Sequence, residues 1–203
     1  MNKIIILLII AFTAFSCGSK DNKMQNQENK QQSTQETKKD SGMDKTTQTK
    51  TGDLKVKSSA FTDEGMIPKK FACNGDNVSP EVSWDGAPAG TKSFALIVDD
   101  PDAPSGDHVH WIVYNIPPDV KELTEAVPND TKLPNGALQG TNGSEKTGYS
   151  GPCPPSGTHR YYFKVYALDN MLKPSVYVTK DILLNSMKGH ILAQGQLMGK
   201  YSK

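Results

Sequence analysis

The sequence predicts a mostly β domain over residues 54–203, built as a sandwich or barrel of short strands. Two observations predict it. Short runs of apolar and β-branched residues recur along this part of the chain, and stretches rich in glycine and proline separate them. Such punctuation is typical of antiparallel β-structure, whereas a βαβ fold would alternate strands with longer helical patterns.

Three runs are the strongest strand candidates. Ser93–Val98 is continuously apolar after its first residue, as expected of a strand that is buried on both faces. His110–Ile116 is a second run, and two prolines follow it at once. Tyr161–Leu168 is the third, rich in tyrosine and other residues that favour strands.

One helical pattern lies near the C-terminus, over Thr179–Ala193. Thr179 is a candidate N-cap, and Asp181 adds a negative charge to the first turn. Gly189 weakens the middle of the pattern, so one helix or two short helices remain open. The residues that approximate one face are Ile182, Leu183, Met187, His190 and Ile191.

The N-terminus, residues 1–16, has the pattern of a lipoprotein-type signal peptide. Lys3 supplies the positive charge, and Ile4–Phe15 is an uncharged apolar run. At about a dozen residues this run is shorter than the roughly 20 that cross a bilayer as a helix. Cys17 follows it directly, which indicates a lipidated cysteine as the first mature residue. Simple cleavage after Ser16 stays open, because the two residues before Ser16 depart from the usual lipoprotein pattern.

Residues 17–53 are low in complexity and consist mainly of polar and charged side chains. Such a segment cannot bury enough apolar surface to offset the entropy of ordering it, so we expect a disordered tether. Together with the signal, it predicts a bacterial envelope protein that a lipid on Cys17 anchors to the membrane. If Cys17 is not lipidated, the protein is secreted.

The net charge and the cysteine content bear on the possible partners of the protein and on its redox environment. The formal net charge of the chain is +1, which gives no reason to expect a nucleic-acid partner. Of the three cysteines, Cys73 and Cys153 remain as an even pair if Cys17 carries lipid. We expect a disulfide between them in an oxidising compartment. By loop-closure entropy, a bond across a loop of about 80 residues would stabilise the fold by about 4.5 kcal/mol.

Two segments are dense in residue types that carry chemistry, Asp99–His110 and Gly151–Tyr162. Prolines stiffen both segments. On a strand, His108 and His110 would share one face, since side chains alternate with a period of two. By the same rule His159 and Tyr161 share a face, while Arg160 takes the other.

Several chemical classes lack their signature. The sequence has no P-loop and no dinucleotide-binding fingerprint. The histidine pair at 108 and 110 has no third ligand at a diagnostic spacing, so no metal and no cofactor are expected. A hydrolase built on the histidines and aspartates would need a nucleophile or metal that the sequence does not supply. The same loops could also be purely structural, with prolines and aspartates forming turns.

The two segments resemble the signature regions of the phosphatidylethanolamine-binding protein (PEBP) family, in its bacterial Raf kinase inhibitor-like branch of the YbhB/YbcL type. The first is Asp-Pro-Asp-Ala-Pro at 100–104, followed by His-Trp at 110–111. The second is Gly-Pro-x-Pro-Pro-x-Gly-x-His-Arg-Tyr at 151–161. Supporting matches lie at 71–80, 83–84 and 189–193. The resemblance runs from about residue 54 to 201.

The resemblance implies a fold of two antiparallel sheets, with a small anion-accepting pocket at one end. The signature regions would line that pocket. Imidazole N–H groups and a tyrosine hydroxyl would serve as donors to phosphate oxygens, and the aspartates would orient the histidine rings or receive a head-group ammonium. The residues implied are Asp100, Asp102, His110, Pro154, Pro155, His159 and Tyr161, with His108 a less uniform position.

The expected function is therefore non-catalytic binding of a small anionic ligand, such as a phosphate ester or a phospholipid head group. Binding should strengthen as the pH falls towards the ordinary histidine pKa, near 6.5. The alternative is an inhibitor or interaction module that acts on a protease or a signalling partner, since relatives in the family are associated with such roles.

Overall fold

The computed structural model of the chain describes residues 52–174 and 177–203, and it confirms the mostly β architecture. A six-stranded sheet has the strand order β1-β9-β8-β4-β5-β7, and a three-stranded sheet has the order β2-β3-β6. The predicted signal peptide and most of the predicted tether lie outside the described residues. The strands are β1 (Gly52–Asp53), β2 (Lys55–Lys57), β3 (Val82–Asp85), β4 (Ser93–Asp100), β5 (His108–Ile116), β6 (Glu122–Leu123), β7 (Leu138–Gln139), β8 (Thr158–Leu168) and β9 (Ile191–Ser202).

The three predicted runs form the centre of the large sheet. β4 pairs antiparallel with β5 on one side and with β8 on the other. Every residue of β4 is buried, which confirms the burial predicted for Ser93–Val98, and Asp99 and Asp100 beyond that run are buried as well. Most pairings are antiparallel, whereas the short β1 runs parallel to β9. β1 includes the last two residues of the segment expected to be a tether, because backbone pairing needs no apolar side chain.

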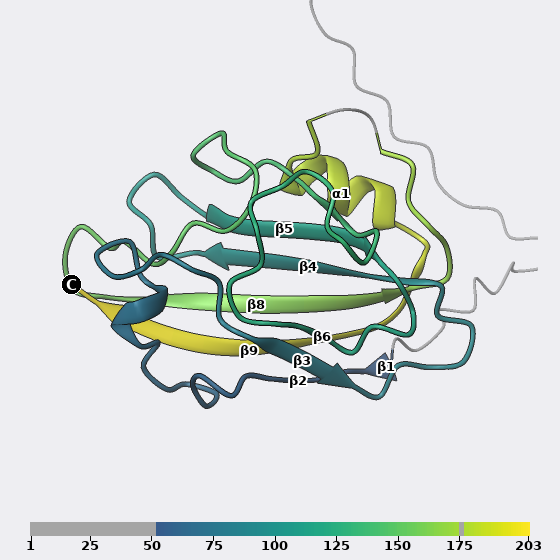
Figure 1. Ribbon diagram of the computed structural model, residues 1–203, viewed down its shortest axis with the longest axis horizontal. Coiled ribbons are helices and arrows are strands. Elements are labelled where there is room, and N and C mark those ends of the chain that lie inside the picture. The colour runs from purple at the N-terminus through teal and green to yellow at the C-terminus, as the bar shows by residue number, and fades with distance from the viewer. Residues whose placement is uncertain (1–51, 175–176) are drawn as a thin grey trace, which may run out of the picture. The chain divides into compact units, whose positions relative to one another are not determined.

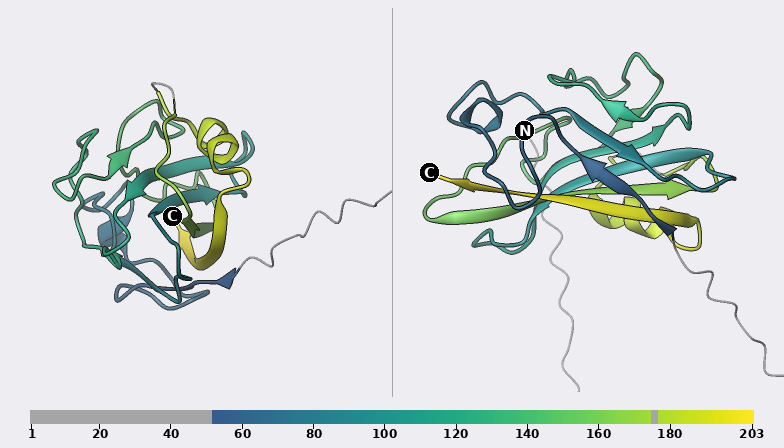
Figure 2. Two further views of the ribbon diagram at one scale, coloured as in Figure 1. Left: turned by 90° about the vertical axis from the view of Figure 1, so that its right-hand side faces the viewer. Right: turned by 90° about the horizontal axis from the view of Figure 1, so that it is seen from below.

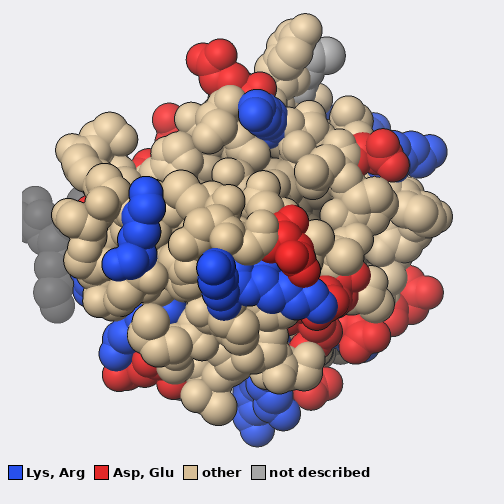
Figure 3. Space-filling view, turned by 60° about the vertical axis from the view of Figure 1, so that its left-hand side comes forward, with Lys and Arg blue, Asp and Glu red and all other residues tan. Residues whose placement is uncertain are grey.

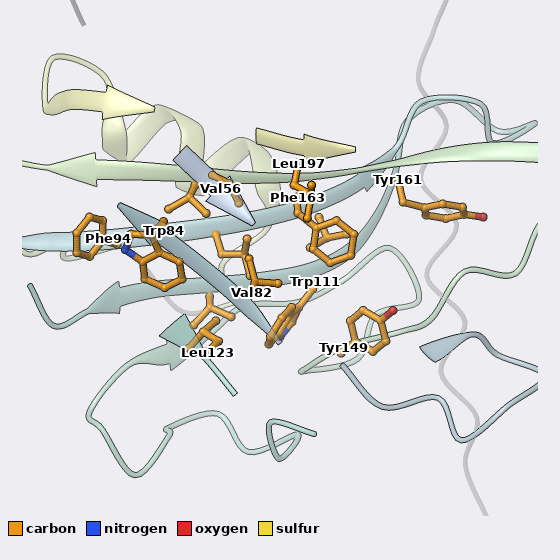
Figure 4. Packing of buried hydrophobic residues seen from close by; sticks show 14 of the residues in the cluster. Val56, Val82, Trp84, Phe94, Trp111, Leu123, Tyr149, Tyr161, Phe163 and Leu197 are labelled. Carbon is orange, nitrogen blue, oxygen red and sulfur yellow. The ribbon is translucent and has the colours of Figure 1, made fainter. Parts of the chain in front are cut away.

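The main core lies between the two sheets. Trp84 from the small sheet packs on Phe94 from the large one, with ring centroids 5.3 Å apart. Trp111 and Phe163 bury their side chains completely in the same cluster. Figure 4 shows these side chains converging between the strands from which they come. Alternate residues of the central strands therefore belong to this core.

The other residues of the central strands meet a helix. α1 (Lys180–Met187) buries Leu183 and Met187 in a second apolar cluster, which includes Ile97 of β4 and Ile112 of β5. Figure 1 shows α1 lying beside these strands, and the end-on view in Figure 2 shows it as a separate layer. β4 is buried on both faces because the small sheet covers one and α1 the other.

The helix prediction was right at its start and wrong at its end. The Thr179 hydroxyl accepts from the backbone N–H of Ile182 at 3.5 Å, so Thr179 is the N-cap. The helix stops at Met187 rather than Ala193, and β9 begins at Ile191. Gly189 lies between them with a φ of 77°, a conformation that glycine adopts without strain and that ends a helix. Outside α1, a short 3-10 helix spans Lys69–Phe71.

The sheet has one end where the signature segments meet. β4 ends there, while β5 and β8 begin there, so residues far apart in sequence come together at the left of the sheet in Figure 1. Among the described residues, no helix has the length and apolar character needed to cross a membrane.

Candidate functional site

A cavity of about 350 Å³ opens at this end of the sheet. The loop after β4 and the first residues of β5 and β8 form most of its wall. Loops from two other parts of the chain complete it. The lining residues are Cys73, Asp100, Ala103, Pro104, Ser105, His108, His110, Ser144, Ser150, Gly151, Cys153, Pro155 and His159.

A buried pair of Asp100 and His159 stands in the wall. The Oδ2 atom of Asp100 lies 2.7 Å from Nδ1 of His159, and both side chains are at least nine-tenths buried. The backbone N–H of Asp102 donates to the other carboxylate oxygen of Asp100 at 2.8 Å. A carboxylate with both oxygens occupied is held in one orientation. It also balances the charge of a protonated imidazole.

His110 is held by a different acceptor. Its Nδ1 lies 2.6 Å from the carbonyl oxygen of Ser150. The ring packs edge-on against His108 and against Tyr161, with centroid distances of 4.9 and 5.1 Å. Burial lowers the pKa of His110 below its ordinary value, and the neighbouring His108 lowers it further. The neutral imidazole therefore predominates at neutral pH.

The Nε2 atoms of His110 and His159 are both available to contact a ligand. Within the described residues, Nε2 of His110 and Nε2 of His159 have no hydrogen-bond partner. Both atoms also remain partly accessible to solvent. Because both rings line the cavity, we infer that both Nε2 atoms open into it.

Asp102 does not line the cavity, although the resemblance placed it in the wall. Its carboxylate accepts two hydrogen bonds from the Arg160 guanidinium, at 2.6 and 2.8 Å, and one from the Arg160 backbone N–H at 3.0 Å. The Arg160 side chain lowers the pKa of Asp102 to about 2. Both aspartates were expected to orient histidine rings. Only Asp100 does so, whereas Asp102 binds the loop to β8.

Tyr161 and Pro154 also lie outside the lining. The Tyr161 hydroxyl is sealed from solvent and has no hydrogen-bond partner among the described residues. Burial raises the pKa of this hydroxyl. The Tyr161 ring packs against His110. In this conformation its hydroxyl is not accessible to a ligand. His159 and Tyr161 do share a face of β8, as the alternation predicted, because both are buried and Arg160 between them is exposed.

A disulfide joins Cys73 to Cys153 at the mouth of the cavity, with their Cα atoms 5.4 Å apart. The same two loops are linked by the backbone, since the N–H of Cys73 donates to the Pro152 carbonyl at 3.0 Å. The Asn77 side chain accepts from the Gly151 N–H at 2.8 Å. At Gly151 a Cβ atom would lie 2.3 Å from the Phe71 carbonyl oxygen, so only glycine fits this approach.

The sequence interpretation missed the third loop of the cavity, residues 140–150. The Asn142 side chain organises it by accepting from two backbone N–H groups and donating to the Gly148 carbonyl. This places Ser144 in the lining, where Ser105 and Ser150 also lie. The Asn-Gly dipeptide at 142–143 marks a turn, but a turn signal does not indicate where the loop will pack.

Chemistry rather than size distinguishes this cavity. A larger hollow of about 540 Å³ near Tyr114 has no histidine, cysteine or carboxylate among its lining residues. No group of three or more histidine, cysteine or acidic residues suited to a metal ion occurs in the described part of the chain. Figure 3 shows lysine, arginine and acidic side chains interspersed on the face that it displays. A basic surface of the kind that binds nucleic acid is absent from that face.

Comparison with known proteins gives a consistent result. The family described as phosphatidylethanolamine-binding protein matches residues 57–202. A UPF0098 protein of Methanothermobacter thermautotrophicus is 49% identical over 150 residues, which are 74% of this chain and 99% of that protein. A UPF0098 protein of Aquifex aeolicus is 44% identical over 154 residues, covering 74% and 89% of the two chains.

Two solved structures resemble the described domain. One is a putative phosphatidylethanolamine-binding protein homologue from Chlamydia trachomatis, at 43% identity and a TM-score of 0.69, covering 75% of this chain and 99% of that one. The other is E. coli YbcL, described as a new member of the mammalian PEBP family. It is 34% identical, with the same TM-score and the same coverage.

Proposed function

Because the chain belongs to the phosphatidylethanolamine-binding protein family, we propose that its cavity binds a small phosphate-bearing anion without catalysing a reaction. The observation that carries the proposal is the Asp100–His159 pair. Asp100 holds a ring whose Nε2 opens into the cavity, and this buried carboxylate would balance the charge of the ring when it is protonated. A protonated imidazole donates a charge-assisted hydrogen bond to an oxyanion.

The absence of a prepared nucleophile in the lining favours binding over turnover. The only cysteines in the lining are bonded to each other. The lining serines have no side-chain hydrogen bond to either free Nε2 atom within the described residues. An activated serine would need such a contact with a base.

The proposal predicts that His159→Ala weakens the binding of inorganic phosphate at pH 6 by at least about tenfold, the effect of losing one charge-assisted hydrogen bond. Isothermal titration calorimetry gives the affinities, and thermal melting checks the fold. His190→Ala is the matched control, because His190 pairs with Asp169 at 2.8 Å in the same way but lies exposed and outside the cavity. Equal affinities in wild type and His159→Ala would refute the proposal.

We further propose that the protein is exported and held at the bacterial envelope by a lipid on Cys17, as the apolar run before it suggests. Cys17→Ser should then move the protein from washed membranes into the soluble fraction. Mass spectrometry of the N-terminal peptide gives an independent reading. An unmodified Cys17 thiol in the membrane-bound protein would contradict the anchor.

A further inference from the structure

The hydrogen bond at His110 fixes which ring nitrogen carries the proton. A carbonyl oxygen can only accept, so Nδ1 of His110 must donate to Ser150 across the 2.6 Å contact. In the neutral ring, Nε2 then holds a lone pair and no hydrogen. The atom that opens into the cavity is a hydrogen-bond acceptor, not the donor that an anion site is expected to supply.

The surroundings of His110 favour this neutral form. The titratable groups beside His110 are His108 on its own strand, Asp100 on β4 and Tyr161 on β8, and Asp99 acts on it from the other side of the sheet. Both aspartates raise the pKa of His110, and so does the bond to Ser150, but burial outweighs them and the net shift is downward. His108 acts in the same direction as burial.

The rest of the lining does not suit a doubly charged anion. Among the described residues that line the cavity there is no lysine or arginine, and one carboxylate, Asp100, is present. A phosphate dianion would set its oxygens against the lone pair on His110 and against the charge of Asp100. A singly charged ester that keeps one P–OH group instead offers a donor to His110. Its other oxygens can accept from His159 and from serine hydroxyls.

We propose, on the basis of the anion-binding function above, that the cavity selects phosphate monoesters in their singly protonated form, with the P–OH group donating to Nε2 of His110. Phosphodiesters carry one negative charge but no P–OH group. They therefore leave the His110 acceptor unmatched and bind less well. The selectivity depends on the proton of the ligand and not on its net charge.

Methyl phosphate and dimethyl phosphate test the inference in the wild-type protein. At pH 5.5 both are predominantly monoanions, because the second ionisation of a phosphate monoester lies near 6. Methyl phosphate should bind about tenfold more tightly, the effect of one hydrogen bond to a buried group that would otherwise be unpaired. Calorimetry or NMR titration measures both affinities. Equal affinities would overturn the inference and leave the anion site intact.

Two further measurements test whether the proton on the ligand causes the preference for methyl phosphate. Between pH 5.5 and 8, the affinity for methyl phosphate should fall more than that for dimethyl phosphate, which does not titrate in this range. In the methyl phosphate complex, ¹⁵N NMR should show His110 neutral, with its proton on Nδ1. A doubly protonated His110 ring in that complex would overturn the inference.

A variant then locates the selectivity. His110→Ala should bind the two esters with affinities within about twofold of each other, whereas His190→Ala should keep the wild-type preference. A preference that survives in a folded His110→Ala protein would overturn the role of His110. If wild type bound neither ester, the anion-binding function itself would fail, and the selectivity with it.

Discussion

Asp99 and Asp100 are neighbours on β4, yet only Asp100 lines the cavity, and the two carboxylates have different partners. Asp99 points to the α1 side of the sheet and is completely buried. It accepts from Lys164 through both oxygens at 2.8 Å and from Lys180 at 2.5 Å. Asp100 points the other way, where it pairs with the imidazole of His159 and accepts from the backbone N–H of Asp102.

The difference lies in the partners rather than in burial. Lys164 and Lys180 occupy both carboxylate oxygens of Asp99, and none of these three residues lines the cavity. The imidazole that pairs with Asp100 lines the cavity, so the Asp100 pair lies where a ligand would bind. The alternation of side chains along a strand, with a period of two, is what assigns the adjacent carboxylates to opposite sides of the sheet.

The largest effect should come from Asp99→Asn. Removing one partner from a buried ion pair leaves the other charges uncompensated, and we expect the free energy of unfolding to fall by about 3 kcal/mol. Urea unfolding followed by the fluorescence of the two buried tryptophans, Trp84 and Trp111, measures it. The affinity for phosphate should change by less than about threefold, because Asp99 does not line the cavity.

Asp107→Asn is the control for that variant. Asp107 pairs with the same Lys180 but is exposed, so its loss should cost less than about 1 kcal/mol. If the two variants lost equal stability, burial would not be what makes Asp99 important. The contrast with Asp100 would then lose its physical basis.

Asp100→Asn should show the opposite balance. The amide oxygen can still accept a hydrogen bond, so we expect the free energy of unfolding to fall by only about 1 kcal/mol. The neutral amide cannot balance a protonated His159, and phosphate affinity at pH 6 should therefore drop by about tenfold. Calorimetry and urea unfolding of the same preparation give both numbers. A large stability loss with unchanged affinity would reverse the roles assigned to Asp99 and Asp100.

The sequence predicted the parts of the fold that depend on local pattern. The apolar run at Ser93–Val98 became a strand covered on both faces, and Thr179 became the N-cap of α1. The predicted helix ran too far, to Ala193, because the sequence around Ile191 fits one face of a helix as well as it fits a strand. Only the tertiary pairing of Leu168 with Ile191 decides between the two.

The sequence predicted several residues of the cavity but not the contacts between them. The signature segments contained Asp100, His110, Pro155 and His159, all of which line the cavity. The proton position on His110 was beyond prediction, because it depends on a carbonyl 40 residues away in sequence. The pairing of Asp102 with Arg160, 58 residues away, was equally hidden. Contacts of this kind follow from how loops pack, which no residue pattern records.

The smallest effect concerns Asp102, a third carboxylate in the same segment. Its pKa of about 2 results chiefly from its hydrogen bonds to Arg160. In Arg160→Ala we expect the pKa of Asp102 to return towards the ordinary value near 3.9. A lowered carboxyl pKa contributes stability that is present above the unfolded value and lost as the pH falls towards the folded value. In wild type this contribution therefore disappears between about pH 4 and pH 2.

NMR titration of the Asp102 carboxyl carbon in both proteins measures the shift. Lys200→Ala is the matched control, because Lys200 lies opposite Arg160 on β9 yet pairs with Glu64 instead. A pKa that stays near 2 in Arg160→Ala would mean that backbone N–H groups, and not the guanidinium, hold the charge. Asp102 would then resemble Asp100, whose carboxylate also accepts a backbone N–H. The division between carboxylates that hold the fold and those that serve the cavity would be less sharp than the contrast of Asp99 and Asp100 indicates.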